Sequence, residues 1–263
     1  MAKDWFFTAD THFGHGNIIK YCKRPFLSTQ EMKMCDFISD GTVECSEVKI
    51  SDKAIQQMDE TISKSINDVV GKNDNLVIIG DFCHEKSNKN VKYYRDMIEC
   101  RNIYLILGNH DDRSKCVEHF TACYENYLFN IDGQRIFTSH YPARAWNKSN
   151  KGAWMLYGHV HNALAGEDNG FLSNYEKHVL GDGFASVLKR WGLKDEKVVQ
   201  ELLEIVRSTK GAALTLDVGV DNARVDLPFG APWSMSDIRN YMANKMPLWQ
   251  ARKAILKMLP PRI

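Results

Sequence analysis

Residues of the types that bind divalent metals recur at five places between positions 10 and 161, and each place follows a short apolar run. They are Asp10 and His12, Asp81, Asn109 and His110, His140, and His159 and His161. Imidazole nitrogens and carboxylate or amide oxygens are the donors that hard and borderline divalent cations select. The chemistry that these residue types indicate is therefore metal-assisted.

The spacing within the motifs supports this interpretation. In the first and last motifs the two ligand types stand two positions apart, and on an extended chain such residues point to the same face. A glycine precedes three of the motifs, at Gly80, Gly108 and Gly158, which allows the close backbone approach that a crowded site needs. Any one of these histidines alone fits a structural role as well as a metal site. The complete ordered set is what favours the metal site.

The apolar runs that position these motifs are predicted to be strands. They are short, nearly continuous and rich in aromatic or β-branched residues, which is typical of strands buried on both faces. They occupy residues 5–9, 76–79, 103–107, 136–137, 154–157 and 212–220. Sites in open α/β sheets lie outside the carboxyl ends of the strands, so the ends of the first five runs could deliver their polar groups into one crevice.

Helical patterns lie between the early strands. Apolar residues recur at helical spacing over 55–70 behind Ser51 and Asp52, and residues 90–100 form a weaker candidate. This alternation indicates parallel pairing and a layered α/β architecture. In the tail, Ser234 and Asp237 suggest a capping box for a helix that ends before Pro260.

Residues 162–211 interrupt the strand series with a glycine-containing loop and two amphipathic helix candidates, at 185–191 and 196–206. We expect one domain over residues 1–263 with this helical insertion. Because the insertion begins directly after His161, it could cap the crevice and select substrate. The alternative is a helical excursion that packs on the outer layer.

Composition limits the function classes. Lys and Arg number 34 against 33 Asp and Glu, a net charge of +1, so no global field gathers polyanions such as nucleic acid. The seven cysteines include no CxxC pair, so neither a disulfide framework nor a structural zinc site is indicated. No apolar run approaches the roughly 18 residues of a membrane span, and no signal peptide is evident. We expect a cytoplasmic protein without a membrane partner.

The ordered motifs DTH (10–12), GD (80–81), GNHD (108–111), SH (139–140) and GHVH (158–161) resemble the calcineurin-like metallophosphoesterase superfamily. Within it, the segment DTHFGHGNIIKYCKRPF and the later DVGVD (217–221) are similar to a branch of small bacterial and phage phosphoesterases. The resemblance implies an α/β fold, a four-layer αββα sandwich of two mixed sheets flanked by helices.

The resemblance also implies two divalent metal ions. Asp10, His12 and His161 would hold the first, Asn109, His140 and His159 the second, and Asp81 would bridge them. A hydroxide between the metals would be the nucleophile in an in-line displacement. The motifs contain no cysteine ligand, which favours hard or borderline metals over soft ones without choosing among them. We expect manganese, with iron, zinc, cobalt or nickel as alternatives.

His110 is the member of GNHD that the family pattern leaves free to face substrate, and we expect it to be the general acid because imidazole can carry a proton near neutral pH. Asp111 either orients His110 or caps the following helix. In protein phosphatases an Asp-Arg pair follows GD, whereas here the run is Gly80-Asp81-Phe82-Cys83-His84-Glu85, which weakens assignment to that subset. The candidates for phosphate contacts beside the ligand motifs are then His15, Arg113 and Arg144.

These features predict a binuclear metal-dependent phosphoesterase, a hydrolase that prefers a phosphodiester over a phosphomonoester. The neutral charge balance favours a small phosphoester or nucleotide over extended nucleic acid. Two alternatives stay open: a nuclease on the same site, and a catalytically silent binding or scaffold module on the same fold. The complete ligand set argues against the silent module, since a decayed member should have lost a ligand.

Overall fold

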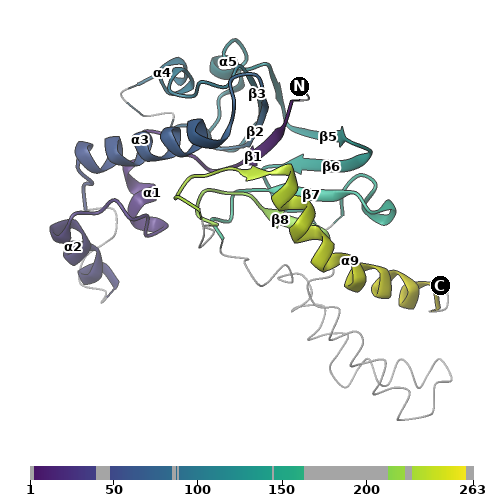
Figure 1. The fold of residues 1–263 in the computed structure, drawn as a ribbon. Helices are drawn as coiled ribbons and strands as arrows, with labels where there is room; N and C mark the ends of the chain where they lie inside the picture. Colours follow the sequence, from purple (N-terminus) through teal and green to yellow (C-terminus); the bar gives the residue numbers. More distant parts are fainter. Residues whose placement is uncertain are drawn as a thin grey trace.

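The computed structural model describes residues 3–39, 48–84, 87, 89–143, 145–162, 213–222 and 227–258 (Figure 1). Nearly all of the expected insertion at 162–211 and the candidate phosphate ligand Arg144 lie outside these described residues. The described elements form two sheets with flanking helices.

The first sheet has five strands in the order β4-β3-β2-β1-β9. Their bounds are Ala122–Tyr124 for β4, Asn102–Ile106 for β3, Asn75–Ile79 for β2, Trp5–Thr8 for β1 and Trp233–Ser234 for β9. Strands β1 to β4 pair in parallel, with Phe7 opposite Val77 and Val77 opposite Tyr104, whereas β9 runs antiparallel to β1. The carboxyl ends of the four parallel strands therefore lie at one edge of the sheet.

The second sheet has four strands in the order β5-β6-β7-β8. Their bounds are Asn126–Ile131, Gln134–Ser139, Trp154–Tyr157 and Thr215–Asp217. Strands β5 and β6 form an antiparallel hairpin, and β6, β7 and β8 are parallel. Both sheets are mixed, which confirms the predicted fold class of an α/β protein with two mixed sheets flanked by helices.

The helices are α1 (Gly16–Tyr21), α2 (Thr29–Ser39), α3 (Asp52–Val69), α4 (Val91–Asp96), α5 (Arg113–Cys116) and α9 (Met235–Met258), with a short 3₁₀ turn η2 at Ser149–Lys151. Figure 1 shows α3, α4 and α5 on the side of the first sheet away from the second sheet. Within the described ranges, no helix has the length and apolar character needed to cross a membrane.

Two apolar cores meet at β2 because successive side chains of a strand point to opposite faces. Leu76 and Ile78 belong to the core that contains Met58 and Ile62 of α3, whereas Val77 belongs to the core between the two sheets. These five side chains, β2 and α3 alike, are fully buried. A strand buried on both faces reads as a continuous apolar run, which is why the sequence alone located β2.

Capping residues set the starts of α3 and α9, the two longest helices among the described residues. The Ser51 hydroxyl accepts a hydrogen bond from the Ala54 N–H at 3.3 Å at the start of α3. At α9 the Asp237 N–H donates to Ser234 Oγ at 3.1 Å, and the Ser234 N–H donates to Asp237 Oδ2 at 3.0 Å. This reciprocal pair is the predicted capping box. Ile238, one turn into α9, is fully buried in the core between the sheets.

Strand β5 and the helices α1 and α2 are elements that the sequence analysis does not predict. In β5 only Phe129 and Ile131 are buried, so this edge strand lacks a continuous apolar run. The turn to β6 places Asp132 and Gly133 at φ of 48° and 80°, as a two-residue type I′ hairpin requires. The Asp-Gly pair is the sequence signal that could have located this hairpin.

Candidate metal centre

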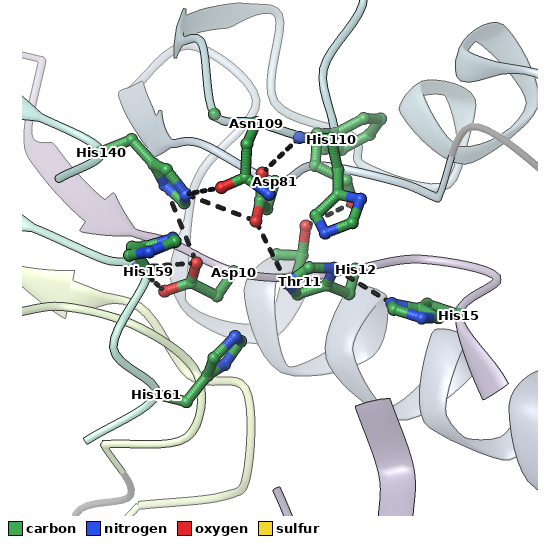
Figure 2. A network of polar contacts seen from close by, with 12 residues as sticks. Asp10, Thr11, His12, His15, Asp81, Asn109, His110, His140, His159 and His161 are labelled. Carbon is green, nitrogen blue, oxygen red and sulfur yellow. Dashed lines mark hydrogen bonds and ion pairs between the residues drawn. The ribbon is translucent and has the colours of Figure 1, made fainter. Parts of the chain in front are cut away.

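The side chains singled out from the sequence gather where five strands end, Asp10 and His12 after β1, Asp81 after β2, Asn109 and His110 after β3, His140 after β6, and His159 and His161 after β7 (Figure 2). Their donor atoms form three groups, in each of which the atoms lie within 4.8 Å of one another: Asp10, His12 and His161; His12, Asp81 and His110; and Asp81, His140 and His159. The structure thus brings residues from distant parts of the chain into one cluster.

Backbone conformation at the cluster is unusual. Five of its non-glycine residues have left-handed backbones, with φ of 55° at Asp10, 50° at His12, 53° at Asp81, 71° at His159 and 46° at His161. Such conformations each cost on the order of 1–3 kcal/mol and persist where the surrounding structure enforces them. Because they coincide with the polar cluster, they indicate a functional site held in place by the two sheets.

Asp81 has the central position in the cluster. Its Oδ2 lies 3.4 Å from His12 Nε2 and 3.3 Å from His140 Nε2, and its Oδ1 accepts the His110 backbone N–H at 2.9 Å. Burial raises the pKa of Asp81, but the hydrogen bond from His140 and the nearby positive charge outweigh burial and hold that pKa below its ordinary value. An ionised carboxylate therefore lies between two groups of histidines.

The far nitrogens of three histidines have acceptors that set the orientation of the rings. His140 Nδ1 lies 3.1 Å from the Ile79 carbonyl oxygen, and His161 Nδ1 lies 2.7 Å from Asp221 Oδ2. His12 Nδ1 lies 3.3 Å from His15 Nδ1. Where Nδ1 carries the proton and donates it in a hydrogen bond to the acceptor, Nε2 keeps a lone pair that points into the cluster. This arrangement is typical of metal-binding histidines.

Burial and charge at the cluster fit a bound cation. His12 Nε2 is buried without a hydrogen-bond partner, and burial lowers the pKa of this imidazole to about 2, so its lone pair is free. Burial also raises the pKa of Asp10 to about 7, against the lowering effect of His161 and His140. A buried carboxylate needs compensating positive charge, and an orphaned imidazole nitrogen needs a partner. A divalent cation would satisfy both.

Gly80 allows His140 to approach the turn after β2. A Cβ atom added at Gly80, whose φ is +83°, would lie 2.1 Å from His140 Nδ1, which is far inside contact distance. Gly108 has the same role at the next turn, where an added Cβ would lie 2.2 Å from Asp81 Oδ1. A side chain at either position would displace a residue of the cluster.

We expect Gly80→Ala to lower the metal content of the protein, and Gly133→Ala is its matched control. Gly133 also has a positive φ, +80°, but its added Cβ would meet nothing within 4 Å. Both variants should lose about 1–2 kcal/mol of unfolding free energy from left-handed strain, measured by urea titration. Only Gly80→Ala should lose bound metal by elemental analysis. Equal metal contents in the two variants would contradict this account.

Asp111 and His110 lie in the loop after β3. The Asp111 carboxylate accepts backbone N–H groups of Asp81 (2.8 Å), Phe82 (2.9 Å) and Gly108 (2.9 Å). The interpretation of Asp111 as a helix cap is wrong, because Asp112 caps α5 through the Ser114 N–H. Asp111 instead ties the β2 and β3 turns together.

The three residues predicted to contact phosphate differ in where the structure places them. His15 is buried beside His12, and its ring centroid lies 4.0 Å from that of His84 and 5.8 Å from that of His110. Arg113 is not brought into the cluster, since its exposed guanidinium lies against Glu125 (3.5 Å) and the Cys123 carbonyl oxygen (3.4 Å). Arg144 is outside the described residues.

The structure also adds residues that the sequence analysis does not assign to the site. Tyr141 is 49% exposed, its ring lies 4.5 Å from that of His159, and its hydroxyl donates to Asn109 Oδ1 at 3.3 Å. Cys22 forms a further group of donor atoms with His161 and Asp221. The absence of a CxxC pair therefore does not keep cysteine away from the cluster. Tyr141 directly follows the ligand type His140, and that adjacency was its only signal in the sequence.

Comparisons with known proteins show what this chain is similar to. Residues 50–175 match the model of the calcineurin-like phosphoesterase superfamily domain. An uncharacterized protein of Methanocaldococcus jannaschii is 30% identical over 155 residues, which cover 58% of this chain and 66% of that protein, just under two thirds of its length. The resemblance to the calcineurin-like phosphoesterase superfamily that the ordered motifs indicate is thus confirmed over residues 50–175.

Two solved structures are distantly similar to this chain. A protein of unknown function from Aquifex aeolicus is 22% identical, with 61% of this chain and 80% of that chain covered and a TM-score of 0.41. YfcE, a phosphoesterase from E. coli, is 15% identical, with 60% and 70% covered and a TM-score of 0.28. Both likenesses are too distant to bear on the residues of the site.

Proposed function

We propose that this chain is a binuclear metal-dependent phosphoesterase that hydrolyses a small phosphodiester or nucleotide in preference to a phosphomonoester. The observation that carries the proposal is the position of Asp81, whose single Oδ2 atom lies within 3.4 Å of His12 Nε2 and 3.3 Å of His140 Nε2. A carboxylate between two sets of nitrogen and oxygen donors is suited to bridge two cations.

The proposed ligands divide around that bridge. Asp10, His12 and His161 would hold one ion, and Asn109, His140 and His159 the other. The groups Asp10–His12–His161 and Asp81–His140–His159 support this division, as does the 3.2 Å distance from His140 Nε2 to Asn109 Oδ1. Nitrogen and oxygen donors fit hard and borderline divalent metals, and of these we propose manganese, with iron, zinc, cobalt and nickel as alternatives.

The chain's own residues would bind and orient the substrate and move one proton. When bound, the two cations would supply Lewis acidity and lower the pKa of water. His110 would donate the proton to the leaving oxygen, and its backbone is held to Asp81 Oδ1 at 2.9 Å. The His110 ring lies 5.2 Å from that of His12, beside the cluster. Asp111 would position His110 indirectly, because its hydrogen bonds connect the loop that carries His110 to the turn after β2.

His15 would contribute a neutral polar contact. Burial, with a smaller effect from His84 and His110, lowers the pKa of His15 to about 3, so the ring is uncharged near neutral pH. Its Nδ1 can accept a hydrogen bond from His12 Nδ1–H, and its Nε2–H can donate a hydrogen bond to a phosphate oxygen. We assign no phosphate contact to Arg113, because its exposed guanidinium lies beside Glu125 at 3.5 Å.

We expect chelator-treated protein to regain hydrolysis when manganese is restored, with two manganese ions bound per chain. The experiment couples elemental analysis to a panel of phosphomonoesters, linear phosphodiesters, cyclic nucleotides and single-stranded nucleic acid. Turnover should be faster on small diesters than on monoesters. Fastest turnover of single-stranded nucleic acid would support the nuclease instead, and two bound metals with no hydrolysis on any substrate would support the silent scaffold.

A further inference from the structure

Arg24 is positioned by the end of α1. Lys23 has a left-handed backbone with φ of 51°, the Arg24 N–H donates to the Ile19 carbonyl at 2.8 Å, and the Lys23 N–H donates to the Lys20 carbonyl at 3.3 Å. These two bonds form a Schellman ending, after which the chain leaves the helix. The Arg24 side chain is fully buried, although arginine is among the residues least often buried without a partner.

The guanidinium of Arg24 joins two distant segments. Its Nε donates to Asp221 Oδ1 at 2.8 Å and its Nη2 to Asp221 Oδ2 at 2.7 Å, a bidentate pair with the chain just after β8. Its Nη2 also donates to the Asp10 carbonyl at 2.7 Å, and its Nη1 donates to the Thr11 carbonyl at 3.1 Å. Arg24 thus holds the turn that carries Asp10 against the segment that carries Asp221.

Asp221 connects Arg24 to the cluster. Its Oδ2, besides the contact with Arg24, accepts from His161 Nδ1 at 2.7 Å. The three side chains form a line from guanidinium to carboxylate to imidazole, and both charged members are almost completely buried. Within the described contacts, Arg24 is bonded both to the backbone of Asp10 and to the partner of His161.

We propose that Arg24 and Asp221 are positioning residues for the metal group of Asp10, His12 and His161, an inference that rests on the proposed function. Asp221 sets the ring orientation and tautomer of His161, as carboxylates do for metal-binding histidines. Arg24 fixes Asp221 relative to the Asp10 turn, and so sets the separation of the ligands that come from β1 and β7. Neither residue touches substrate.

Lysine cannot replace Arg24 in this role. Four of the Arg24 contacts are made by a planar fork that meets two carboxylate oxygens and two carbonyl oxygens at once. An ammonium group is a point donor on a flexible stem and cannot hold both segments in one geometry. Asn at position 221 would offer one acceptor oxygen where Asp offers two, so it cannot serve both His161 and the two guanidinium nitrogens.

The test is a titration of chelator-treated protein with manganese(II), in which binding is measured by calorimetry and by electron paramagnetic resonance. In Arg24→Lys and Asp221→Asn, one of the two manganese ions should bind about 10- to 100-fold more weakly, the usual effect of losing an outer partner of a ligand. The second ion should keep its affinity, and its spectrum should become that of an isolated ion. Unchanged binding of both ions in folded variants would overturn the proposal.

Arg95→Lys is the matched control. Arg95 also braces the chain, through the carbonyl oxygens of Ile98 (2.8 Å), Cys100 (2.7 Å) and His119 (3.2 Å), but it contacts no residue of the cluster. Its variant should lose thermal stability and keep both manganese affinities. A weakened ion in Arg95→Lys as well would mean that general destabilisation explains the effect, which would also overturn the proposal.

Two further results separate this inference from the proposed function and from misfolding. Wild-type protein that binds fewer than two manganese ions would contradict the proposed function itself. In zinc-loaded, unmodified protein, nitrogen-15 spectra of the imidazoles should show the proton of His161 on Nδ1. The opposite tautomer would overturn the positioning role without any variant.

Discussion

Asp81→Asn is expected to lower the rate of phosphodiester hydrolysis by more than about 100-fold and to release at least one of the two metals. This loss exceeds the usual effect of removing a residue that only positions a metal ligand. The asparagine keeps the shape of Asp81 but loses the charge that offsets two cations. It also weakens the acceptor for the His110 N–H, now 2.9 Å from Asp81 Oδ1. Elemental analysis and steady-state rates at saturating manganese check both losses.

Asp59→Asn is the control for removal of a buried carboxylate. Asp59 lies on α3, burial raises its pKa to about 7, and its Oδ1 accepts the Gly14 N–H at 2.9 Å. Asparagine can accept the same hydrogen bond, so this variant should keep both metals. Two tightly held metals in the Asp81→Asn protein would contradict the assignment of Asp81 as the bridge.

His110→Ala is expected to keep both metals and to lose about 10²- to 10⁴-fold in rate on esters with poor leaving groups, the usual scale for general acid catalysis. Esters of nitrophenol should lose less, because nitrophenolate departs without protonation. Rates on matched alkyl and nitrophenyl phosphodiesters, with metal content measured on the same preparations, test both parts.

His119→Ala controls for the loss of an imidazole, since His119 lies outside the cluster with Nε2 3.5 Å from Glu118. It should retain wild-type rates on both esters. An equal loss on both ester types in His110→Ala would exclude the acid role. Loss of a metal would make His110 a ligand, as its grouping with His12 and Asp81 within 4.8 Å also permits.

The elements that the sequence predicts are those whose local pattern is self-sufficient. Strand β2 is buried on both faces, and α3 buries the apolar residues Met58, Ile62 and Ile66, which stand four positions apart, so each element carries its own signal. Strand β5 is an edge strand with alternating burial, and α1 is only six residues long, Gly16–Tyr21. Such elements depend on what packs against them, and a local pattern does not report that.

For the site, the sequence by itself determined which donor types follow which strands, because each motif adjoins a recognisable apolar run. Only the tertiary structure decided which of these side chains meet, and it left Arg113 outside the cluster while placing Asp81 between His12 and His140. It also decided the link from Arg24 to Asp221, which stand 197 positions apart. A buried ion pair between such distant residues leaves no periodic pattern in the sequence, since it forms only when the β1 turn and the end of β8 are folded against each other.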